Sequence, residues 1–142
     1  MDLTAFAVEI GQTAVWGVMA IALLAIGYGV VDLLTPGKLG RLIYVEHNVN
    51  AAIVLGSGLL AIGMIVTTSI LTSLDGFVDG VATAFAFGLL GILLLALSFL
   101  IVDRLTPGEL GAIVTDPSVT PAAWVVGANH LALGAIIAAA IS

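Results

Sequence analysis

One polar stretch organises this sequence: Asp32-Leu33-Leu34-Thr35-Pro36-Gly37-Lys38-Leu39-Gly40. It recurs 71 residues later (from 32 to 103) as Asp103-Arg104-Leu105-Thr106-Pro107-Gly108-Glu109-Leu110-Gly111. The same shift aligns residues 12–71 with residues 83–142 without a gap, and roughly 22 of these 60 positions are identical. The sequence therefore predicts a tandem duplication, with repeat 1 over residues 1–74, repeat 2 over residues 81–142, and a polar hinge in the middle of each copy.

Composition indicates that the solvent of this chain is lipid. The chain has 142 residues, of which 61% are hydrophobic and 8% charged, and its mean hydropathy is +1.29. A water-soluble domain of this length cannot bury so much apolar surface. The formal net charge of −6 disfavours nucleic acid as a partner. Because cysteine is absent, disulfides and thiolate metal sites are excluded.

Four runs without charged residues are long enough to cross about 30 Å of hydrocarbon. They cover residues 11–31, 48–73, 81–102 and 120–142. In each hinge, Thr35 or Thr106 is predicted to cap a short amphipathic helix that lies in the membrane interface, with the following proline in its first turn. The predicted fold is an all-α integral membrane protein whose four transmembrane helices form two tandem, parallel helix–hinge–helix repeats.

The charges of the hinges predict the orientation in the membrane. Each repeat crosses twice, so both repeats insert with the same orientation and their relating axis runs along the membrane normal. The basic residues Lys38, Arg41 and Arg104 all lie in the hinges. The positive-inside rule therefore places both hinges in the cytoplasm and both termini outside.

His130 is the candidate intramembrane polar site, together with its neighbour Asn129. His130 lies near the middle of the fourth span, on the same helical face as Gly127 and Gly134. One interpretation is a proton relay or an ion-coordinating group. The other is a neutral histidine that joins two helices through one hydrogen bond. The shift of 71 places Leu59 at this position in repeat 1, so either role belongs to one repeat only.

Two grooves of small residues are predicted to pack helices together, because small side chains allow backbones to approach closely. We expect the second and fourth spans to form the most intimate contact through them, and we favour a contact within one chain. The grooves are Ala52, Gly56 and Gly63 on the second span, and Ala123, Gly127 and Gly134 on the fourth.

The remaining polar residues predict structure rather than chemistry. Asp32 and Asp103 end helices, where the helix dipole disfavours a carboxylate, so we expect each to accept hydrogen bonds from its hinge. Glu46 and His47 would make at best a weak two-ligand metal site. No catalytic triad, HExxH motif or phosphate-binding loop is present, so we expect no enzymatic activity, no metal and no cofactor.

The repeated Asp-x-x-Thr-Pro-Gly hinge, the stretch 48–52 (Asn-Val-Asn-Ala-Ala) and the glycines of the second span resemble domain-of-unknown-function family 350. The resemblance extends from about residue 12 to the end, and repeat 2 departs from it with Pro121 where repeat 1 has Asn50. It implies a small prokaryotic inner-membrane protein built of two two-helix repeats. It also implies partner proteins of an envelope-stress system and no established biochemical activity.

Two functions remain open at this level. The first is a self-associating membrane scaffold, with the lipid bilayer, further copies of the chain and membrane-stress proteins as partners. The alternative is a small ion or proton channel or carrier, formed between repeats or subunits and lined by His130, Asn129 and residues 67–69. Few polar groups lie within the spans, and this favours the scaffold.

Overall fold

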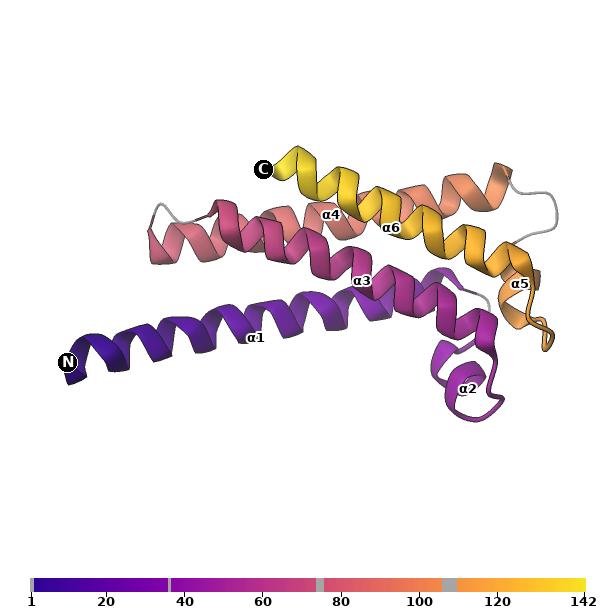
Figure 1. The fold of residues 1–142 in the computed structure, drawn as a ribbon, viewed down its shortest axis with the longest axis horizontal. Helices are drawn as coiled ribbons and strands as arrows, with labels where there is room; N and C mark the ends of the chain where they lie inside the picture. Colours follow the sequence, from indigo (N-terminus) through magenta and orange to yellow (C-terminus); the bar gives the residue numbers. More distant parts are fainter. Residues whose placement is uncertain (1, 36, 74–75, 106–109) are drawn as a thin grey trace.

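A computed structural model describes residues 2–35, 37–73, 76–105 and 110–142, which form six helices (Figure 1). Four of these are long and apolar enough to cross a membrane, which confirms the predicted all-α fold with four spans. The order of a long helix, a short helix and a long helix occurs twice along the chain. The helices are α1 (Leu3–Leu34), α2 (Leu39–Tyr44), α3 (Val49–Thr72), α4 (Phe77–Leu105), α5 (Leu110–Thr115) and α6 (Pro121–Ile141).

The helix that contains the first span extends beyond the charge-free run of residues 11–31. It begins at Leu3 rather than Gly11, because the Asp2 carboxylate accepts a hydrogen bond from the Thr4 backbone N–H at 3.0 Å and caps the helix. Glu9 lies on the exposed surface of this helix and does not interrupt it. A single carboxylate therefore marks the end of an apolar run without marking the end of the helix.

The start of the first hinge helix was predicted wrongly. Thr35 does not cap α2 but ends α1, where its hydroxyl donates to the Val31 carbonyl at 2.8 Å. The helix α2 begins at Leu39, whose backbone N–H donates to the Asp32 carboxylate at 2.7 Å. Gly37 adopts a φ of 91° between the two helices, a conformation that favours glycine. The hinge residues Pro36, Thr106, Pro107 and Gly108 lie outside the described residues.

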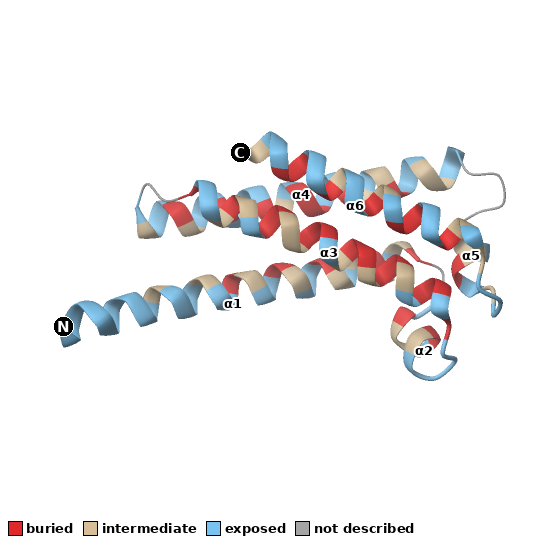
Figure 2. Cartoon of the chain, viewed as in Figure 1, coloured by how far each residue is buried: buried red, intermediate tan, exposed pale blue. Residues whose placement is uncertain are grey.

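The helix α3 lies at the centre of the molecule and contacts all five other helices (Figure 1). Its most extensive interface is with α6, which runs beside it in the same direction. Buried residues follow α3 along its length, whereas the N-terminal half of α1 is exposed (Figure 2). One apolar core lies toward the hinges and includes Val54, Phe99 and Val126, and a second includes Leu23, Ile62 and Ile92.

Candidate functional site

The groove on α6 is filled by α3. Ala123 is fully buried at its start, and Gly127 and Gly134 are buried further along. A methyl group added at Gly134 would lie 2.7 Å from Cβ of Ala61 and 2.6 Å from its Cα, so this position has no room for any side chain. A methyl group at Gly127 would lie 3.1 Å from Cγ2 of Ile53. The small residues of α6 therefore permit backbone-to-backbone packing.

The groove on α3 is open. Ala52 is exposed, and a methyl group added at Gly56 or Gly63 would meet no atom within 4 Å. This surface forms a cleft of about 810 Å³ that Thr67 and Thr68 also line. The expected contact between two matched grooves is thus not formed within the chain. The reason is that α3 meets α6 through a different face, which carries Ser57 and Ala61.

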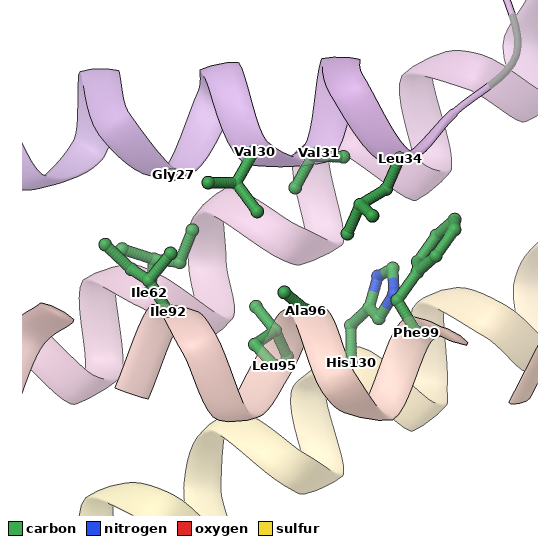
Figure 3. Close-up of a pocket in the computed structure, with 10 residues that line it drawn as sticks. All are labelled: Gly27, Val30, Val31, Leu34, Ile62, Ile92, Leu95, Ala96, Phe99 and His130. Carbon is green, nitrogen blue, oxygen red and sulfur yellow. The ribbon is translucent and has the colours of Figure 1, made fainter. Parts of the chain in front are cut away.

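His130 joins α6 to α3 through a polar contact in this interface. Its side chain is 2% exposed, and its Nδ1 atom lies 3.0 Å from Oγ of Ser57. The Ser57 hydroxyl also lies 3.0 Å from the carbonyl oxygen of Val54, within its own helix. On its other side the imidazole stacks on Phe99 of α4, with ring centroids 5.7 Å apart and an interplanar angle of 24° (Figure 3).

The space beside His130 is small and apolar. The cavity that it lines has a volume of about 10 Å³, close to the minimum that one water molecule requires. Of the described residues that line it, only His130 has a polar side chain (Figure 3). A buried water needs two to four polar partners, so this cavity offers no place for a file of water molecules.

The other polar residues of the spans do not converge on His130. Asn129 is half-buried, and its Nδ2 atom has no hydrogen-bond partner among the described residues. Thr67 is exposed on the outer cleft, whereas the Ser69 hydroxyl donates to the Ile65 carbonyl of its own helix at 2.9 Å. The residues proposed for a transport path therefore occupy separate parts of the molecule.

Two asparagines at the start of α3 fasten the repeats together, and we refer to them as the clasp. Asn50 is 1% exposed and donates from Nδ2 to the carbonyls of Asp116 at 3.1 Å and Ser118 at 2.7 Å. Its Oδ1 atom accepts from the backbone N–H of Thr120 at 3.0 Å. Asn48 caps α3 by accepting from Ala51 N–H and also donates to the Asp116 carbonyl at 2.9 Å.

The inter-repeat role of the clasp was not predicted from the sequence. Asn48 and Asn50 both stand at the start of the second apolar run, yet one helix start accommodates one N-cap residue. The other asparagine, if buried, then requires partners elsewhere, and this was the available signal. Which backbone it meets depends on a loop 66 to 70 residues away, which local sequence does not specify.

The loop held by the clasp is also ordered by its own aspartate. The Asp116 carboxylate accepts hydrogen bonds from the Ser118 hydroxyl at 2.6 Å and from the Ser118 backbone N–H at 2.8 Å. These hydrogen bonds lower the pKa of Asp116, because they stabilise its ionised form. The loop thus presents its carbonyls to Asn50 in a fixed conformation.

The charged residues near the hinges have structural partners or stay exposed. The guanidinium Nε of Arg41 lies 3.0 Å from Oε1 of Glu46, and both side chains are largely exposed. His47, the other half of the weak predicted metal pair, is exposed and has a φ of 53°. Asp103 lies half-buried near the end of α4.

Comparison with known proteins gives the family. A family model described as Domain of Unknown Function (DUF350) matches residues 4–141. A UPF0719 transmembrane protein of Mycolicibacterium paratuberculosis is 33% identical over 130 residues, covering 92% of this chain and 86% of that protein. A UPF0719 transmembrane protein of Mycobacterium bovis is 26% identical over 142 residues, covering 100% of this chain and 93% of that protein. No solved structure matches significantly. The chain is a multi-pass transmembrane protein and belongs to the DUF350 family.

Proposed function

We propose that this chain is a non-enzymatic, self-associating scaffold of the prokaryotic inner membrane. One observation supports this most: His130 contacts Ser57 across the interface between α3 and α6, while the packing groove on α3 faces outward. The family resemblance adds a setting, because it implies partner proteins in an envelope-stress system. A scaffold of this kind acts by positioning proteins in the bilayer, which requires outer surfaces rather than an internal cavity.

A channel or carrier is the competing function. A path between the repeats is disfavoured, because the cavity at His130 holds about 10 Å³ and conduction requires a continuous polar or hydrated route. A pore between subunits would use Thr67 and Thr68, which line the outer cleft. This second route keeps the channel as an alternative for the assembled protein.

Proteoliposomes and native mass spectrometry separate the two functions. We expect wild-type protein extracted from membranes to be oligomeric, and reconstituted vesicles to show no specific proton or cation flux. A specific flux that His130→Gln abolishes, in a variant that still assembles, would establish transport instead, since an amide cannot titrate. A strictly monomeric protein in membranes and in mild detergent would exclude the self-associating scaffold.

We also propose that the hinges lie in the cytoplasm and both termini outside. Because the chain lacks cysteine, a single introduced cysteine reports one position without background. Cysteines at Lys38 and Ser118 should be protected from an impermeant thiol reagent in intact cells, whereas one at Asp79 should react. All three residues are exposed in the structure. Reversed labelling would invert the orientation, and opposite labelling of positions 38 and 118 would exclude parallel repeats.

A further inference from the structure

The contact between the repeats has an unpartnered counterpart on the outside of the molecule. Within the chain, Ala61 of α3 is fully buried against Gly134 of α6. The shift of 71 converts this pair into Ala132 and Gly63. Ala132 is exposed on α6, and Gly63 faces open space on α3. The same two surfaces are therefore present a second time, each without its partner.

The other two long helices repeat this observation independently. Leu23 of α1 is fully buried on α4, where it would lie 2.6 Å from a methyl group added at Gly88. The shifted pair is Leu94 and Gly17. Leu94 is 42% exposed, and a methyl group at Gly17 would meet no atom within 4 Å. A leucine and the glycine surface that would receive it are thus both exposed.

A third pair shows that residue type does not explain why one position is buried and its counterpart in the other repeat is exposed. Ile65 of α3 is fully buried against Gly91 of α4, whereas its counterpart Ile136 of α6 is 63% exposed. In all three pairs the buried residue and its exposed counterpart are identical amino acids, at positions 23 and 94, 61 and 132, and 65 and 136. Repeat 2 therefore carries the same three buried-type residues as repeat 1. Repeat 1 has a glycine at two of the three receiving positions, Gly63 and Gly17, whereas Gly91 corresponds to Ala20.

We propose that a second copy of this chain docks head to tail, with its α6 in the open groove on α3. A contact between two different surfaces leaves one of these surfaces unpaired at each end of the assembly. Further copies of the chain can add there. The proposal rests on the self-association proposed above and specifies its interface. Because both repeats are predicted to cross the membrane in the same direction, the copies are related by rotation about the membrane normal, and successive docking closes a ring.

The contact between copies is weaker than the contact within a chain, because two polar links are missing from it. The counterparts of Ser57 and His130 are Ala128 and Leu59, which cannot exchange a hydrogen bond. The clasp is missing as well, since Val119 and Pro121 stand where repeat 1 has its two asparagines. The assembly should therefore dissociate under conditions that leave each chain folded.

Oxidative cross-linking in membranes tests the proposed interface. A methyl group at Gly127 would lie 3.5 Å from Cβ of Ser57, a separation that suits a disulfide. The shifted pair is Gly56 and Ala128. Gly56→Cys and Ala128→Cys chains should cross-link to dimers when co-expressed, and neither should cross-link when expressed alone. A chain with both substitutions should give a ladder of oligomers that ends at the size of the ring.

The control variant carries Ser57→Cys and Gly127→Cys. Its two cysteines should cross-link within one chain, so the cross-linked product remains a monomer. Cross-linking of Gly56→Cys alone would show a two-fold symmetric contact and overturn the head-to-tail interface. An oligomer in which Gly56→Cys and Ala128→Cys do not cross-link would also overturn it, while leaving self-association intact. A monomeric wild-type chain would exclude both.

Blocking variants give an independent readout. Gly63→Leu and Gly17→Leu place side chains on surfaces that are open in the single chain, so both should fold but reduce the assembly to monomers. Folding is read from the intrachain cross-link of the control cysteines, introduced in the same background. Retention of the full oligomer by both variants would contradict the proposal.

Discussion

The grooves on α3 and α6 contain the same small residues at the same spacing, yet only the groove on α6 is packed. At Gly134 of α6 an added methyl group would collide with the backbone of α3, whereas at Gly56 or Gly63 of α3 it would meet nothing within 4 Å. The packed interface differs from the open groove in its polar contacts. The Ser57–His130 contact and the clasp occur in the packed interface, and the equivalent residues at the open groove are apolar. Small residues permit close packing, and hydrogen bonds decide which partner is taken.

The sharpest test of this comparison uses the two equivalent glycines. In nanodiscs that hold one chain each, Gly134→Leu should lower the free energy of unfolding by more than about 3 kcal/mol, because even its Cβ meets the Ala61 backbone. Gly63→Leu, at the equivalent position of the open groove, should leave the thermal midpoint unchanged. Equal effects of the two substitutions would mean that the grooves do not differ in a single chain.

The clasp should give the next largest effect. Asn50→Ala removes three hydrogen bonds to the loop before α6 and should destabilise the chain by about 1–3 kcal/mol, since buried backbone groups lose their partners. Asn129→Ala is the matched control, because Nδ2 of Asn129 has no partner among the described residues. Chemical denaturation in detergent measures both. If Asn129→Ala costs as much as Asn50→Ala, the clasp has no special role.

Two variants of His130 should separate the contributions of hydrogen bonding and of packing to stability. The contact is made by Nδ1, which an asparagine amide can replace, so His130→Asn should retain it and His130→Ala should lose it. We expect His130→Asn to be the more stable variant by about 0.6 kcal/mol, the average for hydrogen bonds between membrane helices. Leu59→Ala, at the equivalent position of repeat 1, shows the cost of truncation without a polar contact. Equal stability of the two His130 variants would remove the hydrogen bond from the explanation.

The smallest expected effect is a dependence on pH at the clasp loop. The pKa of Asp116 is lower in the folded protein than the usual value of about 3.9, so its contribution to stability is fully present above that pH. The contribution is lost as the pH falls through the lowered pKa. Wild type should therefore lose more of its thermal midpoint between pH 5 and pH 3 than Asp116→Asn does. Parallel pH profiles would show that this carboxylate does not stabilise the loop.

The sequence predicted the parts of this fold that depend on local composition. The four spans follow from the length of the apolar runs, and α3 and α6 each begin one residue after the first residue of the predicted run, at Val49 and Pro121. It also placed His130 on the face that meets a neighbouring helix. Apolar length, capping residues and helical spacing act over a few residues, so a single sequence contains enough information to locate them.

The features that were missed depend on distant partners. Asp32 accepts a hydrogen bond from its hinge as expected, but Thr35 does not cap α2, because the hinge positions Asp32 beside Leu39, seven residues further on. The repeat predicts two equivalent grooves, and nothing in Gly56 or Gly127 taken alone indicates which one is filled within the chain. That choice is made by contacts such as Asn50 with Ser118, which join residues far apart in the sequence.

The clasp also constrains the order in which the protein can form. The hydrogen bonds of Asn50 need backbone groups of Asp116, Ser118 and Thr120. They therefore cannot form until nearly the whole chain has been synthesised. The most extensive helix contact, between α3 and α6, has the same long sequence separation and is equally late. During biogenesis the face of α3 that carries Ser57 is therefore exposed until the final helix arrives, and a chain truncated before α6 would leave it permanently uncovered.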